Sequence, residues 1–483
     1  MLQYLQDAKA KRFAYCSNHL LKGGFVMRNL KMKKLLSLLS LIMVFVLVAA
    51  CTPAATPDEA PDAPVVDETP DAPADEDPVD DEVQADNDEE AVTITFSVNV
   101  QPQLPLEFWQ GIADAYMAEN PHVTVELLPN PGAGVTIFEH QATLLATGQF
   151  PDVMVMQNPA DFVPAGALYP FELDFLDFIE EPTVGMIGGN QYVANYKKQV
   201  IGVFYNRDMF EEHGWSVPGT YAEFIALCEE IEAAGILPVS MGIRDGWPQI
   251  MLANMIAGTE LLAGNPGWGA RRNADEVQFD NPDLIRAFER YQEIVQRFSG
   301  PHVAALSYTE MLEQFFNGTA AMLPMGSWVN ADIYALGDDF NAGWFPMPGE
   351  NDANVLSVFI NEGLSVGATD NNQHPEVAKD FVRFFFTNEQ VMSDFLFSEQ
   401  LFWTTVEKFP FQMSPLRQEI GEMIGGMHFV EGFESMTGDD AFLPGLKDYF
   451  TNVLTQNIAM GNDVQSELQA FDAEWERANA ALD

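Results

Sequence analysis

Cysteine is scarce in this chain of 483 residues, which contains three, at positions 16, 51 and 228. We predict that Cys16 belongs to a leader that is removed and that Cys51 is modified, as argued below. Only Cys228 would then remain in the body, so no intrachain disulfide can form. Cys228 lies beside the apolar face of a predicted helix, where we expect a buried, inert thiol. Stability must come from a core, and the 47% of hydrophobic residues can build two sizeable domains.

Basic side chains are also scarce, because 23 Lys and Arg stand against 72 Asp and Glu. A net charge of −49 opposes binding to nucleic acid or to anionic lipid. The acidic residues are spread over the whole chain, which indicates a surface adapted to salt or solubility. A cationic ligand such as a polyamine stays open as an alternative, since acidity would suit it.

The sequence motifs of common catalytic sites are missing. The chain has no nucleophile elbow, no His-Glu metal motif and no glycine-rich phosphate loop. Its seven histidines are scattered, which argues against a metal site. We therefore predict a protein that is not an enzyme and needs no cofactor or metal. One enzymatic alternative remains, in which Asp245 and Glu362 act as the paired carboxylates of a glycosidase.

A long apolar run is missing as well. The uncharged run from Leu35 to Val48 is shorter than the about 20 residues that span a bilayer. Basic residues precede it and small residues follow it, as in a secretory signal peptide. Residues 48–51, VAAC, resemble a bacterial lipobox, whose cysteine thiol receives diacylglycerol and becomes the first mature residue. We predict that residues 1–50 are a lipoprotein signal peptide and that acyl chains such as palmitate on Cys51 anchor the protein outside the cell membrane. An uncleaved transmembrane helix is the alternative.

Residues 51–91 are predicted to be a disordered tether. Positions 52–91 hold 16 acidic residues and seven prolines but no Lys or Arg. So few large apolar side chains cannot offset the entropy lost on ordering. A flexible chain of this length has a root-mean-square span of roughly 35 Å, which would hold a folded body clear of a membrane. Calcium binding is the alternative, although the run lacks the glycine and spacing of a calcium loop.

The folded body begins with strand and helix patterns in alternation. Ile94, Phe96 and Val98 alternate with polar residues, which predicts a strand. The chain then predicts a helix around 108–116, a strand at 123–127, a helical stretch up to Gly148 and a buried strand at 150–156. This order indicates an α/β fold with its ligand edge at the strand C-termini. Three polar residues follow the last strand and are expected to face a crevice: Gln157, Asn158 and Asp161.

A second α/β segment starts near residue 200. Residues 200–205 predict a strand, and 206–210 turn from it into a short helix. Thr220 and Glu223 predict a capping box, in which the hydroxyl accepts from a helical amide and the carboxylate reaches back to the cap. The helix that follows should end at Gly235.

Four segments together resemble a known family. Residues 204–210, FYNRDMF, are similar to the YNKDLF-type segment of extracellular solute-binding proteins of ABC importers, the family 1 proteins that include the maltose-binding protein. The other segments are LLATGQFPDV at 144–153, FNGTAAM at 316–322 with GSW at 326–328, and PMPG at 346–349 with HPEVA at 374–378. They occur in the family's order and spacing, and the resemblance covers residues 92–483.

The resemblance implies a periplasmic-binding-protein-like fold of two α/β lobes joined by a hinge. By correspondence, 92–198 with 361–400 form the N-terminal lobe, and 199–360 with 401–483 form the C-terminal lobe. A sugar or oligosaccharide would bind in the cleft between the lobes and favour their closure. A membrane permease would then recognise the closed form of a protein that we expect to be a monomer.

The resemblance also implies candidate ligand contacts. Trp328 corresponds to a tryptophan that stacks on sugar in the family, although partial burial in a core is the alternative for any tryptophan. Flat aromatic rings with carboxylates and amides are the side chains that sugar C–H faces and hydroxyls require. The further candidates are Trp247, Asp245, Gln199, Asn361, Glu362 and Trp403. Gln157 and Asn158 replace an aromatic-rich pattern of the maltose binder, which leaves the identity of the sugar open.

Overall fold

The computed structural model describes residues 90–101, 103–131, 137–350 and 355–480, without the side chains of residues 138, 355–361 and 434. The predicted signal peptide, Cys51 and the tether up to residue 89 lie outside the described residues. The described residues belong to one compact unit. Within these ranges, no helix combines the length and the apolar character needed to cross a membrane.

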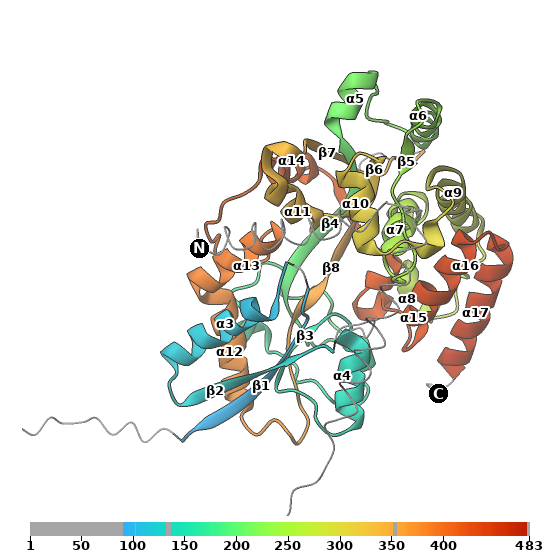
Figure 1. Ribbon diagram of the computed structural model, residues 1–483. Helices are drawn as coiled ribbons and strands as arrows, with labels where there is room; N and C mark the ends of the chain where they lie inside the picture. The colour runs from blue at the N-terminus through green and yellow to red at the C-terminus, as the bar shows by residue number, and fades with distance from the viewer. Residues whose placement is uncertain (1–89, 102, 132–136, 351–354, 481–483) are drawn as a thin grey trace, which may run out of the picture. The chain divides into compact units, whose positions relative to one another are not determined.

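The described strands form one mixed sheet in the order β2-β1-β3-β8-β4-β6-β5, and β7 and β9 pair with β4 and β8 (Figure 1). The strands are β1 (Val92–Val98), β2 (Val123–Pro129), β3 (Val153–Met156), β4 (Ala194–Asn206), β5 (Leu237–Val239), β6 (Ala320–Gly326), β7 (Ala342–Phe345), β8 (Val355–Val366) and β9 (His428–Glu431).

One end of the sheet confirms the predicted α/β start. The strands β1, β2 and β3 run parallel, as alternating strands and helices require. The side chains of Ile94, Phe96 and Val98 are fully buried, so the apolar face of the alternation points into the core. The Phe96 ring meets the edges of Trp109 and Phe381 at centroid distances of 5.6 and 5.1 Å.

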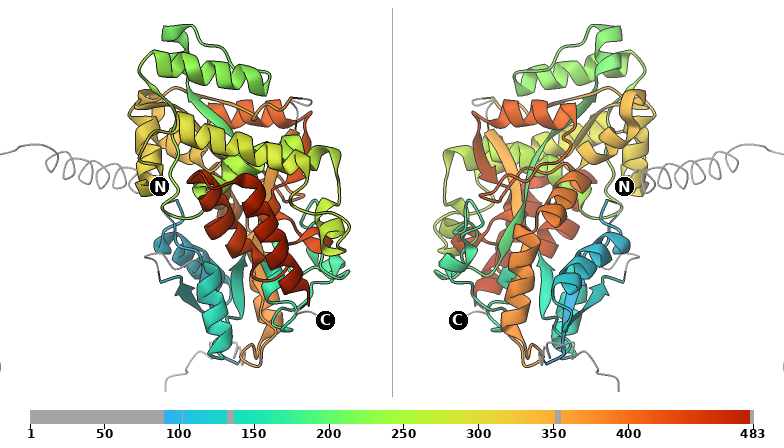
Figure 2. Two further views of the ribbon diagram at one scale, coloured as in Figure 1. Left: turned by 90° about the vertical axis from the view of Figure 1, so that its right-hand side faces the viewer. Right: turned by 90° about the vertical axis from the view of Figure 1, so that its left-hand side faces the viewer.

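The helices cover the faces of this sheet. They are α3 (Leu106–Glu119), α4 (Ile137–Ala146), α5 (Arg207–His213), α6 (Tyr221–Ala233), α7 (Pro248–Glu260), α8 (Trp268–Asn273), α9 (Pro282–Phe298), α10 (Tyr308–Phe316), α11 (Val329–Leu336), α12 (Pro375–Thr387), α13 (Glu389–Glu399), α14 (Pro415–Ile424), α15 (Leu446–Tyr449), α16 (Thr455–Ala459) and α17 (Val464–Ala480). Figure 2 shows α16 and α17 lying beside α9, and α12 lying on the other side of the molecule.

Two long strands, β4 and β8, connect the two ends of the sheet. The first part of β8 pairs with β9 and its last part pairs with β3. The second half of β4 pairs with β6 and β7, and its first half pairs with β8. The register between β4 and β8 shifts on both sides of Lys197, which marks two irregularities in the ladder. We call this stretch, where both strands pass between the two ends, the crossing (Figure 1).

The two ends of the sheet have separate hydrophobic cores. The first core contains side chains of β1, β3, α3, α12 and α13, and it includes Ala194 and Tyr196 of β4. The second core contains side chains of β5, β6, α6, α7, α9 and α17, and it begins in β4 at Val200. The chain therefore changes core within β4, between Tyr196 and Val200. Cys228 is fully buried in the second core, and this burial raises the pKa of its thiol, as expected for an inert group.

The helix ends confirm most of the predicted boundaries and correct one. The Thr220 hydroxyl accepts from the Glu223 backbone N–H at 3.2 Å, as predicted. The Glu223 carboxylate, however, accepts from the backbone N–H of Gly219 rather than from that of the cap residue. The predicted capping box at this helix is therefore wrong in its second half, because the carboxylate reaches one residue further back. A complete capping box stands instead at Ser307 and Glu310.

Candidate functional site

Three aromatic side chains from separate elements meet on the second-core side of the crossing. Trp247 precedes α7, Tyr308 opens α10, and Trp328 lies between β6 and α11. The ring centroid of Trp247 is 4.8 Å from that of Tyr308 and 6.0 Å from that of Trp328. The indole Nε1 of Trp328 donates to the Tyr308 hydroxyl oxygen at 3.1 Å. All three side chains are half-buried, so each ring retains accessible surface. We call these three residues the aromatic cluster.

The local sequence explains why these rings meet. A Cβ at Gly326 would lie 1.9 Å from Cζ3 of Trp328, so the ring can lie over the end of β6 only because residue 326 has no side chain. The capping box of Ser307 and Glu310 fixes the first turn of α10, which carries Tyr308. A proline at the first position of α7 favours helix initiation directly after Trp247.

A carboxylate stands beside the aromatic cluster. Oδ2 of Asp245 accepts a hydrogen bond from the backbone N–H of Tyr308 at 2.8 Å. This N–H belongs to the first turn of α10, where the helix dipole also favours a negative charge. Arg244 lies 3.1 Å from Glu310 and 3.8 Å from Asp245, both on exposed surface. Two of the predicted site residues, Asp245 and Trp247, therefore lie with Trp328 in one place.

A group of buried charges occupies the crossing. The Lys197 ammonium on β4 lies 2.9 Å from Oε1 of Glu362 on β8 and 2.7 Å from Oε2 of Glu399 at the end of α13. The three residues are 5%, 3% and 1% exposed. One cation therefore serves two carboxylates, and we call these residues the buried triad.

The two carboxylates of the buried triad differ in their donors. Glu362 accepts from Lys197, from the Tyr196 hydroxyl at 3.0 Å and from the amide of Gln157. Among the described residues, Lys197 is the only donor found at Glu399. Burial raises the pKa of the Glu399 carboxyl, and Lys197 opposes this rise only in part. Burial alone would lower the pKa of Lys197, but the two carboxylates raise it above its ordinary value.

The aromatic cluster and the buried triad lie close enough to interact electrostatically. Burial raises the pKa of the Tyr308 hydroxyl, and the charges of Asp332 and Glu399 raise it further. Asp332 on α11 accepts from the amide of Gln103 at 2.9 Å, and Gln103 follows β1 at the first-core end. These contacts connect elements of both cores around the crossing.

Two buried amides near Trp328 have hydrogen-bonding atoms without partners among the described residues. Gln199 is 2% exposed and its Nε2 has no partner, and Asn330 is 0% exposed with neither amide atom paired. The pairing of Ile201 with Gly326 continues through Val200 and Ser327, whose backbone atoms bond at 2.8 Å. Gln199 and Trp328 are the next residues along the chain from this bonded pair. Buried amides of this kind normally bond to protein or to water.

The remaining predicted residues are dispersed. Asn158 donates to Asp161 at 2.6 Å, and Asp161 lies near Lys447 of α15. Burial raises the pKa of the Asp161 carboxyl, while the Lys447 ammonium lowers it. Asn361 belongs to β8, but its side chain lies outside the described residues.

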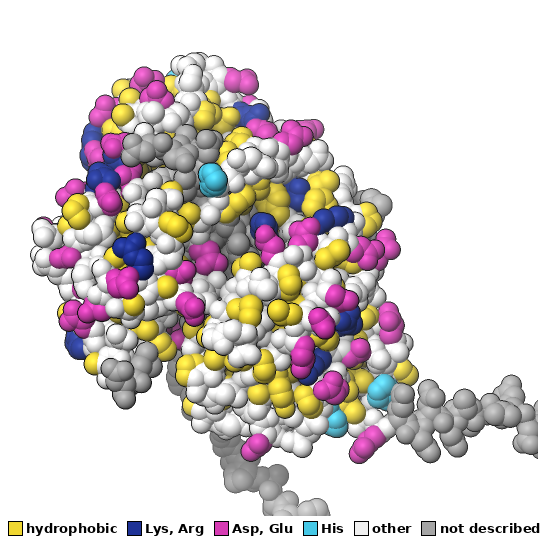
Figure 3. Space-filling view, turned by 180° about the vertical axis from the view of Figure 1, so that it is seen from behind, with side chains coloured by type: hydrophobic (Ala, Val, Ile, Leu, Met, Phe, Trp, Pro, Cys, Tyr) yellow, Lys and Arg dark blue, Asp and Glu magenta, His cyan; other side chains and the backbone are white. Residues whose placement is uncertain are grey.

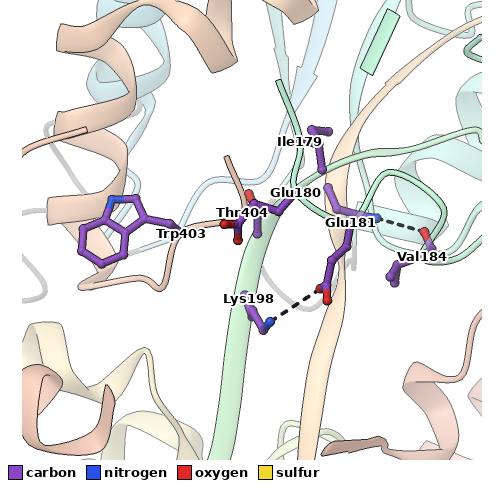
Figure 4. A pocket seen from close by; sticks show the side chains of 8 residues that line it. Ile179, Glu180, Glu181, Val184, Lys198, Trp403 and Thr404 are labelled. Carbon is purple, nitrogen blue, oxygen red and sulfur yellow. Dashed lines mark hydrogen bonds and ion pairs between the residues drawn. The ribbon is translucent and has the colours of Figure 1, made fainter. Parts of the chain in front are cut away.

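Trp403 lies in different surroundings from the aromatic cluster. Its indole N–H donates to the backbone oxygen of Phe409 at 3.2 Å, and its ring packs against Phe411 and under the guanidinium of Arg417. It lines a pocket together with Ile179, Glu180, Glu181, Val184, Asn195, Lys198 and Thr404, in which Lys198 and Glu181 lie 3.5 Å apart (Figure 4).

Sequence reasoning missed Tyr308, Lys197 and Glu399. Tyr308 directly follows the Ser307 cap, and the serine and glutamate of that capping box were a usable signal for a helix start at this place. Lys197 sits in a polar run that resembles a loop, and no local pattern reveals that distant carboxylates bury it. Glu399 is the last residue of α13, where a glutamate normally faces water.

A family model for bacterial extracellular solute-binding proteins matches residues 103–392. The chain belongs to this family. The "Multiple sugar-binding protein" of Streptococcus mutans serotype c is 25% identical over 328 residues, which are 62% of this chain and 72% of that protein. The family resemblance of the four sequence segments is thereby confirmed.

Solved structures of other binding proteins share the fold of this chain. A "Chitin oligosaccharide binding protein" superposes with a TM-score of 0.69 at 22% identity, covering 81% of this chain and 99% of that one. RafE in complex with raffinose superposes with a TM-score of 0.64 at 22% identity, covering 80% of this chain and 99% of that one. The predicted two-lobed α/β fold is therefore confirmed.

Proposed function

We propose that this protein is the substrate-binding lipoprotein of an ABC importer and that it captures a sugar or oligosaccharide. The aromatic cluster is the observation that supports this most directly, because Trp247, Tyr308 and Trp328 gather half-buried rings beside carboxylates and buried amides. The names of a multiple sugar-binding relative and of structures with chitin oligosaccharide and raffinose agree with a sugar ligand.

Each member of the aromatic cluster has a distinct part in the proposed binding. The faces of Trp247 and Trp328 would stack on the C–H faces of a sugar ring. The Tyr308 hydroxyl accepts from Trp328, which leaves its own hydrogen to donate to a sugar oxygen. Asp245 would accept from sugar hydroxyls, as carboxylates do in charge-assisted bonds. The Gln199 amide, whose Nε2 has no partner among the described residues, is a further proposed donor to the sugar.

The other predicted contacts take more limited roles in this proposal. Glu362 already accepts hydrogen bonds from three donors. We therefore propose that it positions Gln157, whose side-chain amide donates to it, and does not itself contact the ligand. Asn158, Asp161 and Asn361 stay candidate contacts from the first-core side. The indole N–H of Trp403 is already bonded, so we assign Trp403 to packing beside its pocket.

The crossing is the proposed hinge. The two lobes would comprise 92–198 with 361–400 and 199–360 with 401–483, as the family resemblance implies. The change of core within β4 and the shifted register around Lys197 support a hinge at this place. Ligand contacts from both lobes would select the closed form, which the permease subunits would recognise on a monomeric receptor.

Membrane attachment is proposed to reside in the N-terminal segment. The family acts outside the cytoplasm, and removal of residues 1–50 with acylation of Cys51 would hold the body at the outer face of the cell membrane. Two or more acyl chains, at about 0.8 kcal/mol for each buried methylene, would make this attachment stable. Residues 51–91 would serve as the spacer. Mass spectrometry of the N-terminal peptide, with Cys51→Ser as the unmodified control, tests this attachment.

A thermal-shift screen against neutral mono- and oligosaccharides tests the proposed function. A ligand at 100 times its dissociation constant should add about 2.7 kcal/mol to the free energy of unfolding. No shift with any neutral carbohydrate would contradict the proposal. Chromatography of the same mixtures tests the glycosidase alternative, because released product would indicate hydrolysis by Asp245 and Glu362. Against that alternative, Glu362 is buried and already bonded to Lys197, Tyr196 and Gln157.

A further inference from the structure

The charges around the aromatic cluster are predominantly negative. Five carboxylates lie beside it or at the neighbouring crossing, and two cations each pair with two of them. The carboxylates are Asp245, Glu310, Asp332, Glu362 and Glu399, and the cations are Lys197 and Arg244. On the face shown in Figure 3, acidic side chains outnumber basic ones.

The two cations are both committed to carboxylates. Lys197 in the buried triad pairs with Glu362 and Glu399 together, so it is not available to a ligand. Arg244 lies at the exposed edge, between Asp245 and Glu310. The carboxylates of Asp332 and Glu399 both raise the pKa of Tyr308. They lie on α11 and α13, two helices whose Tyr334 and Phe397 ring centroids are 5.9 Å apart. A ligand at the aromatic cluster would therefore find no uncommitted cation among these residues.

We propose that the site accepts carbohydrates without negative charge and rejects those that carry a carboxylate or a phosphate. This inference rests on the proposed function and narrows its substrate class. An anionic group beside Tyr308 would stand close to Asp245, which accepts from the Tyr308 backbone N–H at 2.8 Å, and to Asp332, one helical turn after Trp328 on α11. Partial burial weakens screening by water and salt at this place. Like charges brought together without a counter-ion weaken binding strongly.

The experiment compares each neutral sugar with its own acidic form. Glucose, galactose, mannose and their β-linked disaccharides are tested by thermal shift beside glucuronic, galacturonic and mannuronic acids and the corresponding uronate disaccharides. Each carbohydrate that shifts the melting temperature is then titrated calorimetrically at about 0.05 M and about 0.5 M salt, since screening shortens the reach of exposed charges. We expect the uronate to bind at least tenfold more weakly than its neutral counterpart, a difference of about 1.4 kcal/mol or more.

Matched variants separate a local effect from the charge of the whole protein. Asp332→Asn should recover part of the uronate affinity, at least threefold, and should change the affinity for the neutral sugar less. Asp338→Asn is the control, because Asp338 is an exposed acid just beyond α11 and its replacement changes the net charge equally. Circular dichroism of each variant verifies that the fold is retained.

The possible outcomes are distinguishable. Weaker binding of the uronate, with recovery in Asp332→Asn but not in Asp338→Asn, supports the inference. Equal affinities for neutral and uronate forms would overturn it and leave the proposed function standing. Recovery of equal size in both variants would also overturn it, because the rejection would then come from the net charge alone. The absence of any binding by neutral sugars would contradict the proposed function itself.

Discussion

The aromatic cluster and the buried triad lie close together but differ in what they leave accessible. Trp247, Tyr308 and Trp328 are half-buried and retain ring surface and a hydroxyl hydrogen for another molecule. In the buried triad the charges are at most 5% exposed and bond to one another. Under the proposed function, the aromatic cluster would serve binding and the triad would serve the structure of the crossing. Variants in each region should therefore affect different measurements.

Lys197→Met should give the largest loss of stability. The change removes the cation that serves Glu362 and Glu399 and leaves both carboxylates buried without it. Breaking a buried ion pair by removing one partner costs about 3–5 kcal/mol. Urea unfolding followed by tryptophan fluorescence measures the effect. Lys198→Met is the matched control, because the side chain of Lys198 is 28% exposed and pairs with the exposed Glu181, so its loss should cost less than about 1 kcal/mol. Equal losses in both variants would show that the triad has no special structural role.

Trp328→Ala should have the opposite effect to Lys197→Met: ligand affinity should fall strongly while the fold stays intact. We expect sugar binding to weaken at least tenfold, which is about 1.4 kcal/mol, because the main stacking surface is lost. Titration calorimetry with the sugar found by thermal shift gives the affinity. Trp215→Ala is the control, since Trp215 is also half-buried but packs against Phe210 and His213, away from the aromatic cluster. Unchanged affinity in Trp328→Ala would remove this residue from the site.

Gly326→Ala tests whether the position of the Trp328 ring matters as much as its presence. The new Cβ would lie 1.9 Å from Cζ3 of the ring, so the indole must move from its place over the end of β6. Overpacking of this kind costs about 1–3 kcal/mol, and we expect ligand affinity to fall as well. Gly111→Ala is the control, because Gly111 is exposed within α3 and a Cβ there meets nothing within 4 Å. The control should gain about 0.5–1 kcal/mol of stability from its lower backbone entropy. A Gly326→Ala protein with unchanged affinity would show that the ring tolerates displacement.

Most residues of the aromatic cluster could be predicted from the sequence, whereas the buried triad could not, for a physical reason. Trp247, Asp245 and Trp328 stand next to turns and strand ends that local patterns and the family resemblance both identify. The strand predicted at 200–205 begins at Ala194 in the structure, because the polar residues before it are buried by groups far along the chain. Lys197 is stabilised by Glu362 and Glu399, which lie more than 160 positions away. No periodicity within a strand can signal partners at that distance.

Tyr308→Phe tests the smaller contribution of a single hydroxyl within the aromatic cluster. The ring and its contact with Trp247 stay in place, while the acceptor for the Trp328 indole N–H and the proposed donor to sugar are both lost. A hydrogen bond of this kind contributes about 0.5–1.5 kcal/mol, so affinity should fall a few-fold. Calorimetry with the same sugar provides the measurement, and Tyr449→Phe, on α15, serves as the control. A loss as large as that of Trp328→Ala would mean that the hydroxyl, rather than the ring faces, dominates binding.

Glu399→Gln should have the smallest effect, and its sign should depend on pH. Because burial raises the pKa of Glu399 in the folded protein, the folded state holds this proton more tightly than the unfolded state does. The stabilisation from that proton is complete below the ordinary glutamate value of about 4.3 and is lost as pH rises through the raised value. Glutamine carries no such proton, so the stability of the wild type relative to Glu399→Gln should fall as pH increases through this window. Glu389→Gln, at the exposed start of α13, is the control for loss of one acidic group. Urea unfolding across this pH range gives the difference, and a difference that rises or stays flat with pH would show that Glu399 stays ionised within the triad.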